Sequence, residues 1–366
     1  MANLSRTLLA ALTGTLGLWV SASALAADPR AVGCGLVSGW VSVNESLYGT
    51  SMFTADNTYD AMGNLLVQVV TSDYGTLEVR DTTTNMYDHR NKLVSSVHEA
   101  DFNDDGTADW HETVTNTYDR IGSLLHSVTL TESDWNADGT VDARYSVAFT
   151  NTHDAKGNIL TVSYESDYDG DGVVDARVLV ANTYDQHGKL LLRTSQGSSD
   201  TYTYDRRGHV VGIVGIYDVD NDGNVDLYST TTSAYDPQGH ILSNLLETET
   251  HFDGAIYLYS ELRTNTYDAR GNVLTRITEY DYGGDGVIEY GQSDSMTYDF
   301  RGNVLTMVFN STDGAGIVTA QFVQTLTYDD AGNLVLTVGE SDGNGDGVVD
   351  DRSTTTYSYG RTCRKP

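Results

Sequence analysis

One ten-residue phrase recurs along this chain and constrains its fold more than any other feature. Clear copies read NTYDAMGNLL from Asn57 and NTYDARGNVL from Asn265, and the phrase returns about every 31 residues. Its aromatic position is occupied by Tyr59, Tyr87, Tyr118, His153, Tyr184, Tyr204, Tyr235, Tyr267, Tyr298 and Tyr328, with one shortened unit before Tyr204. A period of this length indicates a protein built by repeating one supersecondary unit.

Each unit is predicted to be a β-hairpin. In Y-D-x-x-G-N the aspartate can cap its own turn and the glycine supplies a positive φ, which is typical of a tight reversal. The segments that follow alternate with a period of two, so Ile159 and Thr161 are expected on one face and Leu160 and Val162 on the other. A helix would need a period of 3.6, which these segments lack.

The fold class predicted from these units is all-β. About ten antiparallel hairpins would form one long meander of about twenty strands that is curled or spiralled, with a closed or flattened barrel or a propeller as the alternative. Strands about 4.8 Å apart would span on the order of 95 Å, and a round barrel of that circumference would be too wide for side chains to fill.

Six acidic segments lie at the opposite end of the predicted hairpins from the tyrosine turn. In SDYDGDGVVDAR, from Ser166 to Arg177, aspartates occupy positions one, three, five and nine of a D-x-D-x-D-G calcium loop. Such oxygen ligands suit a hard cation, so calcium is the expected cofactor. The candidate ligands are Asp101, Asn103, Asp105, Asp109 and Glu112; Asp134, Asn136, Asp138 and Asp142; Asp167, Asp169, Asp171 and Asp175; Asp218, Asp220, Asp222 and Asp226; Asp281, Asp285 and Glu289; and Asp342, Asn344, Asp346 and Asp350.

These loops differ from EF-hands at the twelfth position and in their flanks. Only Glu112 supplies the bidentate acid, because the other loops have Tyr145, Val178, Ser229, Gln292 and Ser353 there. The flanking segments read as strands, so no helix pair can open as in a calcium sensor. We expect the loops to be structural clips, with acidic turns that bind no ion as the alternative. The corresponding segments near Asp73, Ser199, Asp253 and Asp313 have lost the pattern.

The N-terminus predicts export. An apolar run from Leu8 to about Val20, followed by the small residues Ala24 and Ala26, indicates a secretory signal peptide cleaved after Ala26. This apolar run is too short to span a membrane, and the sequence has no other long apolar segment. The expected location is therefore secreted, extracellular or at the cell surface, with the periplasm as a further possibility.

The cysteines and the repeat set the expected domain limits. Cys34 and Cys363 are the only cysteines, and two cysteines in an exported chain are expected to pair as a disulfide. We divide the chain into the signal peptide 1–26, an N-terminal cap segment 27–54, the hairpin repeat domain 55–360 and a C-terminal tail 361–366.

The T-Y-D-x-x-G-N-L-L phrase resembles the YD repeat of the rearrangement-hotspot (Rhs) and teneurin-type families over about residues 55 to 360. This resemblance implies β-hairpins in a long sheet strip that winds into a hollow shell, which in bacteria often encloses a C-terminal toxin. The present repeats differ because they are longer and contain the calcium-type loop.

Composition and motifs narrow the function without naming a partner. A formal charge of -31, from 52 acidic and 21 basic residues, disfavours nucleic acid. No nucleophile elbow, phosphate loop or zinc-binding histidine pair occurs, so no catalytic residues and no enzyme activity are expected. The first hypothesis is an interaction, adhesion or scaffolding protein with an extracellular protein or glycan partner. A carbohydrate-binding module is the alternative, and a glycan-cleaving enzyme is the third.

Overall fold

Antiparallel strands joined by short turns make up the described part of the chain. The structure, a computed structural model, describes residues 37–46, 49–73, 78–103, 105–136 and 138–361, and contains no helix within them. The predicted signal peptide and both cysteines of the predicted disulfide lie outside these residues. No helical segment in these ranges has the length and apolarity to cross a membrane.

Twenty-two strands form one sheet. They are β1 (Val37–Ser46), β2 (Gly49–Tyr59), β3 (Leu65–Asp73), β4 (Glu78–Tyr87), β5 (Leu93–Asp101), β6 (Trp110–Tyr118), β7 (Leu124–Ser133), β8 (Ala143–His153), β9 (Ile159–Asp167), β10 (Ala176–Tyr184), β11 (Leu190–Ser195), β12 (Ser198–Tyr204), β13 (Val210–Tyr217), β14 (Leu227–Tyr235), β15 (Ile241–Phe252), β16 (Ala255–Tyr267), β17 (Val273–Asp281), β18 (Tyr290–Tyr298), β19 (Val304–Asp313), β20 (Val318–Tyr328), β21 (Leu334–Asp342) and β22 (Asp351–Arg361). The all-β fold and the antiparallel hairpin meander are thus confirmed.

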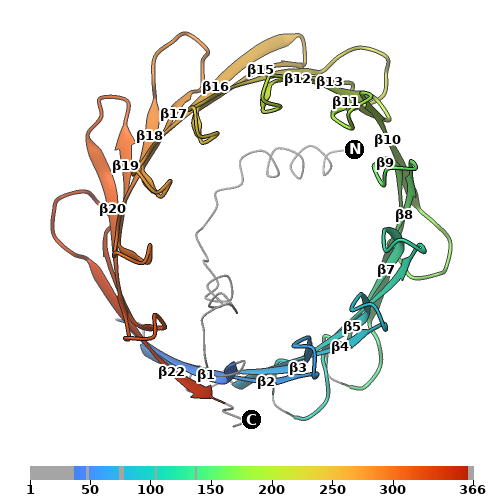
Figure 1. Ribbon diagram of the computed structural model, residues 1–366, viewed down its shortest axis with the longest axis vertical. Coiled ribbons are helices and arrows are strands. Elements are labelled where there is room, and N and C mark those ends of the chain that lie inside the picture. The colour runs from blue at the N-terminus through green and yellow to red at the C-terminus, as the bar shows by residue number, and fades with distance from the viewer. Residues whose placement is uncertain (1–36, 47–48, 74–77, 104, 137, 362–366) are drawn as a thin grey trace.

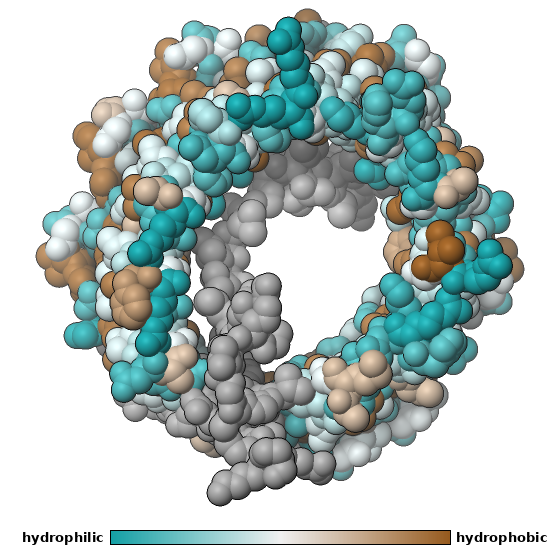
Figure 2. Space-filling view, viewed as in Figure 1, coloured by the Kyte–Doolittle hydropathy of each residue, from teal (hydrophilic) through white to brown (hydrophobic). Residues whose placement is uncertain are grey.

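The meander curls through a full circle. Every strand pairs with the next along the chain, and β1 also pairs with β22, with Val41 opposite Ser358 and Asn44 opposite Thr355. The sheet is therefore a ring with a hollow centre (Figures 1 and 2). Pairing of the end strands removes the two exposed edges that an open spiral would leave. Residues 37–46 and 49–54, assigned from sequence to a cap segment, form β1 and the first part of β2 in the same sheet.

The ten turns of the Y-D-x-x-G type, in which Asn91 replaces the glycine once and His153 replaces the tyrosine once, share one backbone geometry, which the turn from Asp119 to Ser123 illustrates. The N–H of Gly122 donates to the carbonyl of Asp119 at 3.2 Å, and the N–H of Asp119 donates to the carbonyl of Ser123 at 2.9 Å. Gly122 has a φ of 95°, which glycine adopts without strain. The Asp119 carboxylate caps the turn by accepting from the N–H groups of Ile121 and Ser123 at 2.8 Å each. The capping aspartate predicted from sequence is confirmed.

The tyrosine before each turn joins neighbouring hairpins. Tyr87, Tyr118, Tyr184, Tyr204, Tyr235, Tyr267 and Tyr298 each donate a hydrogen bond, 2.7 to 3.2 Å long, to the backbone carbonyl of the strand residue after the preceding turn. In several units the asparagine two residues earlier donates to the same carbonyl, as Asn116 does to Leu93 at 3.1 Å. A register shift at Thr117/Tyr118 marks a bulge beside this contact, where the ladder is interrupted. The repeated phrase therefore encodes both the turn and its link to the previous unit.

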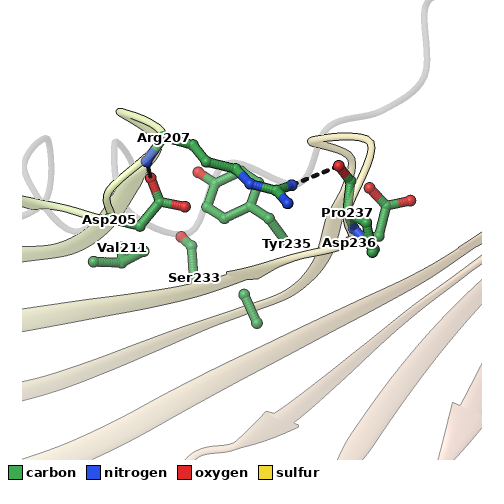
Figure 3. Close-up of a pocket in the computed structure, with 8 residues that line it drawn as sticks. Asp205, Arg207, Val211, Ser233, Tyr235, Asp236 and Pro237 are labelled. Carbon is green, nitrogen blue, oxygen red and sulfur yellow. Dashed lines mark hydrogen bonds between the residues drawn. The ribbon is translucent and has the colours of Figure 1, made fainter.

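The two faces of the sheet differ in character. The Y-D-x-x-G turns curl toward the centre of the ring, while the loops at the other edge bend outward (Figure 1). Figure 3 shows Tyr235 and Ser233 on the side of the sheet toward which these turns curl, so this face is the inner one. On β13 the outward Val214 and Ile216 are 46% and 38% exposed. Figure 2 accordingly shows hydrophilic residues around the opening and much of the apolar surface toward the outside.

A single-layer ring has almost no conventional core. Among the described residues the buried apolar side chains are Ala55, Ala100, Val180 and Leu326. Stability must therefore come from the continuous backbone ladder, cross-strand side-chain pairs and the ordered turns, because the described residues form one sheet and add no second layer to either face.

Candidate metal sites at the acidic loops

Six acidic loops lie together at the outward-bent edge of the ring, opposite the Y-D-x-x-G turns. They join β5 to β6, β7 to β8, β9 to β10, β13 to β14, β17 to β18 and β21 to β22. The sequence-based prediction that the two kinds of loop occupy opposite edges is confirmed by this strand order. Every candidate ligand except Glu112 belongs to one of these loops.

The first aspartate of each loop holds the loop backbone in place. One of its carboxylate oxygens accepts from the N–H of the glycine five residues later, at 2.7 to 2.9 Å in all six loops. This aspartate is buried in five of them, at Asp101, Asp134, Asp167, Asp281 and Asp342. The glycine has a positive φ each time, from 81° to 93°. The bend that glycine permits thus turns the peptide N–H groups toward a carboxylate that the sheet edge already shields.

The acid at position nine closes the loop from the other side. Its carboxylate accepts from the N–H of position two, at 2.7 to 2.9 Å in all six loops. Positions three and five form shorter-range contacts, in which the side chain accepts from the N–H two residues later, as Asp169 and Asp171 do. The acids at positions one, five and nine are therefore oriented by backbone N–H groups in the same way in all six loops. The side chain at position three is oriented likewise in five of them, because Gly283 occupies that position in the loop from Asp281.

Burial and hydrogen bonding compete at the first aspartate. At Asp281 burial would raise the carboxyl pKa, but the N–H groups of Gly286, Gly284, Asp285 and Gly283 outweigh it, and the pKa is lowered. The same balance lowers the pKa of Asp342. These carboxyls are therefore anionic at neutral pH, as a calcium ligand must be.

Three loops bring three carboxylates close enough to share a cation. In the described residues these groups are Asp167, Asp169 and Asp175; Asp218, Asp220 and Asp226; and Asp281, Asp285 and Glu289, with one ligand oxygen from each residue within 4.8 Å of the others. Several acidic clusters could thus hold a metal ion. In the loops that start at Asp101, Asp134 and Asp342, an asparagine occupies position three and would supply an amide oxygen instead.

Glu112 lies apart from the other candidate ligands of its loop. It sits within β6, paired in register with His98 of β5 and Thr131 of β7, and belongs to none of the three carboxylate groups. The segments that had lost the acidic pattern form other connections. Asp253 and Gly254 make a two-residue turn with φ of 51° and 75°, and Asp313 begins a turn like those at the opposite edge, in which it accepts from Ala315 and Ile317.

At the opposite edge, a basic side chain of one turn donates a hydrogen bond to a backbone carbonyl of the next turn. Arg207 donates to the carbonyl of Pro237 at 2.5 Å, across a shallow depression that Asp205, Ser233 and Tyr235 also line (Figure 3). Arg90, Lys156, Arg270 and Arg301 make the same kind of contact with the next turn. Because the repeat itself generates this arrangement, it indicates a structural role and not a single binding site.

The fold and the loops define a class: a closed ring of β-hairpin repeats with acidic loops along one edge. No family model and no curated protein match the chain. Among solved structures it is similar to the toxin complex TcdB2-TccC3, with 11% identity and a TM-score of 0.21 over 80% of this chain and 21% of that one. It is also similar to a porin-like protein from Bacteroides uniformis, with 11% identity and a TM-score of 0.25 over 90% of this chain and 99% of that one.

A further similar structure is Pseudomonas putida OprB, with 10% identity and a TM-score of 0.26 over 89% of this chain and 93% of that one. The chain spans about a fifth to a quarter of the two toxin-complex chains it matches, at 21% and 25% of their lengths. All these similarities are too low to show a family or a function.

Proposed function

We propose that this chain is an exported, calcium-stabilised ring of YD-type β-hairpin repeats with an interaction or scaffolding role outside the cytoplasm. The observation that supports calcium most directly is the shared geometry of the six loops. Each orients oxygen ligands with backbone N–H groups, and three of them place three carboxylates within 4.8 Å. Calcium accepts six to eight oxygens in flexible geometry, which suits such loops.

Charge repulsion supplies the physical reason for an ion. Two carboxylates about 4 Å apart repel by roughly 1 to 4 kcal/mol, depending on the local dielectric constant. Strand pairing at this edge must overcome that repulsion in every loop. Six calcium ions would cancel up to twelve negative charges, so cation binding and the order of this edge should be coupled.

The test is thermal unfolding of the purified protein in 1 mM calcium, in 1 mM magnesium and in chelator, with calorimetry to count sites. At a tenfold excess of ligand over its dissociation constant, each site adds about 1.4 kcal/mol, or roughly 8 kcal/mol for six sites. For a chain of this size we expect calcium to raise the melting temperature by on the order of 10 °C. Identical melting curves in calcium and chelator would leave the loops as ordinary acidic turns.

A scaffolding role is supported by the ring itself. Two depressions on the described surface, one beside Arg207 and one beside His240, are open to solvent and are generated by the repeat. The export signal predicted from sequence would place this surface where calcium is abundant. Pull-down from surface extracts with and without calcium would test this part, and the expected result is partner retention that chelator weakens.

Carbohydrate binding is a second candidate, favoured by one observation. The second residue of four acidic loops is an exposed aromatic: Phe102, Trp135, Tyr168 and Tyr282 are 49%, 79%, 65% and 56% exposed. Aromatic side chains held at a rigid loop are suited to stacking on sugar rings. Retention on immobilised polysaccharides tests this function, and release of reducing ends in the same assay would instead support the third hypothesis, a glycan-cleaving enzyme.

A further inference from the structure

One acidic loop departs from the others in the residues that flank it. The position before the first aspartate is Ala100, Ser133, Ser166, Tyr217, Tyr280 and Ser341 in the six loops, and position ten is Trp110, Ala143, Ala176, Leu227, Tyr290 and Asp351. Only the loop from Asp281 to Glu289 has tyrosine before the loop, at position two and at position ten. A single place that breaks a repeat is where function is expected to concentrate.

These three tyrosines and Tyr259 of the neighbouring strand β16 form a cluster, here called the tyrosine platform. The ring centroids of Tyr280 and Tyr282 are 6.1 Å apart at an interplanar angle of 11°, and those of Tyr259 and Tyr282 are 5.9 Å apart at 29°. Tyr290 lies opposite Tyr280 in the strand register, with centroids 5.5 Å apart. Three strands and a loop thus hold four rings in one contiguous cluster, of which Tyr282 is the exposed member.

The platform belongs to the inner face of the ring. Ser233, which points inward, pairs with Asn244, and Asn244 pairs with Arg263 (Figure 3). Tyr259 lies on the same face as Arg263, since the two are four residues apart on one strand. The inner position makes the platform part of a concave surface, while Tyr282 remains 56% exposed beside the acidic loop.

Polar groups are fixed at the hydroxyl ends of the rings. Tyr259 donates to Oε2 of Glu261 at 3.0 Å, and Tyr280 donates to Oε1 of Gln292 at 3.3 Å. The amide of Gln292 in turn donates to the hydroxyl of Tyr290 at 3.1 Å. Burial and the neighbouring Glu261 raise the pKa of Tyr259, so its hydroxyl stays neutral. The platform therefore combines flat apolar faces with a row of neutral and acidic hydrogen-bonding groups.

The charges around the platform indicate what it can accept. The nearby cations are occupied: Arg263 pairs with Glu261 at 3.1 Å, and Arg276 pairs with Asp294 at 3.5 Å. The adjoining loop adds Asp281, Asp285 and Glu289. An anionic ligand would meet this negative charge, and of the described residues the two cations beside the platform, Arg263 and Arg276, are already paired. A neutral ligand with an apolar face and several hydroxyl groups fits both the rings and their polar edge.

We propose that the tyrosine platform is a binding site for a neutral oligosaccharide, in which Tyr282 and Tyr259 stack on sugar rings, Glu261 accepts hydrogen bonds from the sugar hydroxyls, and the amide of Gln292 donates to or accepts from them. This inference rests on the carbohydrate-binding candidate above and assigns it a place and a substrate class. The backbone N–H of Tyr282 donates to Glu289 at 2.7 Å, so the acidic loop also sets the position of the most exposed ring.

The test uses the full protein in 1 mM calcium with cellohexaose, xylohexaose, laminarihexaose and chitohexaose as neutral probes and trigalacturonic acid as the anionic one. Binding is measured by calorimetry and by intrinsic fluorescence. We expect at least one neutral hexasaccharide to bind, and Tyr282→Ala and Tyr259→Ala to weaken that binding at least about tenfold. Tyr259→Phe, which keeps the ring and removes the bond to Glu261, should weaken it less.

Tyr145→Ala is the control, because Tyr145 is also an exposed tyrosine, at 43%, but lies on β8 and is not one of the aromatic residues at position two of the acidic loops. Its loss should leave binding unchanged. Three results would overturn the proposal: no neutral probe binds, only trigalacturonic acid binds, or Tyr145→Ala weakens binding as much as Tyr282→Ala. Melting curves with and without calcium, run on the same samples, report separately on the calcium-stabilised ring.

Discussion

The hydroxyl of Tyr118 donates a 2.8 Å hydrogen bond to the backbone carbonyl oxygen of Leu93, 25 residues earlier in the chain. Asn116 donates to the same oxygen at 3.1 Å. One carbonyl at the end of a turn thus receives two side chains from the next hairpin. Six further tyrosines of the repeat make the corresponding bond. The tyrosine by which each repeat is recognised in the sequence therefore also joins that repeat to the preceding one.

Removing the Tyr118 hydroxyl should loosen one such joint without changing the packing of the ring. We expect Tyr118→Phe to lower the free energy of unfolding by about 1 kcal/mol, since the Leu93 carbonyl keeps the bond from Asn116. Denaturant unfolding monitored by circular dichroism measures this. The control is Tyr168→Phe, because Tyr168 is exposed on a loop. If both variants lose the same free energy of unfolding, the hydrogen bond from Tyr118 to Leu93 does not stabilise the protein.

His153 gives the opposite experiment. It replaces the tyrosine of its unit, its Nδ1 is buried without a hydrogen-bond partner, and Asn151 donates to the Leu124 carbonyl at 3.1 Å. We expect His153→Tyr to restore the missing donor and raise the free energy of unfolding by about 1 kcal/mol. His153→Phe separates the hydroxyl from the ring. If the phenylalanine variant is as stable as the tyrosine variant, relief of the buried nitrogen explains the gain and the restored bond does not.

Ligand positions one and three of an acidic loop should respond differently to substitution. Asp167 accepts from the N–H groups of Gly170 and Gly172 at 2.7 and 2.9 Å, whereas Asp169 accepts from Asp171 at 3.2 Å. Asp167→Ala should therefore lower the melting temperature in chelator as well as in calcium, because it releases two backbone donors. Asp169→Ala should lower it chiefly in calcium. Equal effects of Asp169→Ala under both conditions would argue against an ion in this loop.

The capping aspartates predict how stability depends on pH. At Asp205 burial would raise the carboxyl pKa, but hydrogen bonds from His209, Gly208 and Arg207 outweigh it and lower the pKa to about 2. At Asp119 the N–H of Ser123 is the largest cause of a lowered pKa. A carboxyl whose folded pKa lies below its unfolded value of 3.8 stabilises the protein above about pH 4. That contribution is lost as the pH falls toward about 2.

We therefore expect the melting temperature in chelator to fall steeply between about pH 4 and pH 2. Asp205→Asn should lower it at pH 7, and the difference from the unmodified protein should shrink as the pH approaches 2. The control is Asp330→Asn. This substitution removes a carboxylate from another turn of the repeat and leaves the capping aspartate of that turn unchanged. A constant difference for Asp205→Asn across this range would contradict the assigned role.

Local sequence predicts the hairpin well because each turn is specified by residues in contact along the chain. Asp119 and Gly122 act within one turn, and the acidic loops likewise depend on side chains that reach N–H groups a few residues away. The position of Glu112 was harder to anticipate, since a ligand count taken from EF-hands assumes a helix after the loop, whereas β6 begins at Trp110 and carries Glu112 into the sheet.

Features that bring distant parts of the chain together depend on the strand register, so they are harder to predict from the sequence. Closure of the ring depends on the total twist and curvature of all its strands, and the sequence of one repeat does not determine that total. The tyrosine platform draws on β16, β17, β18 and a loop, so its rings meet only when the strand register is known. A comparison of equivalent loop-flanking positions would have shown the excess of tyrosine at Tyr280, Tyr282 and Tyr290, and this signal was present in the sequence.

Closure also imposes a rule of parity. Strands that alternate up and down can join the first to the last in antiparallel fashion only if their number is even, as with β1 and β22. A single extra strand would force a parallel seam or an open gap. Growth or shrinkage of such a ring can therefore proceed only by whole hairpins, and the shortened unit of β11 and β12 obeys this rule: it has lost residues from both strands and kept both strands.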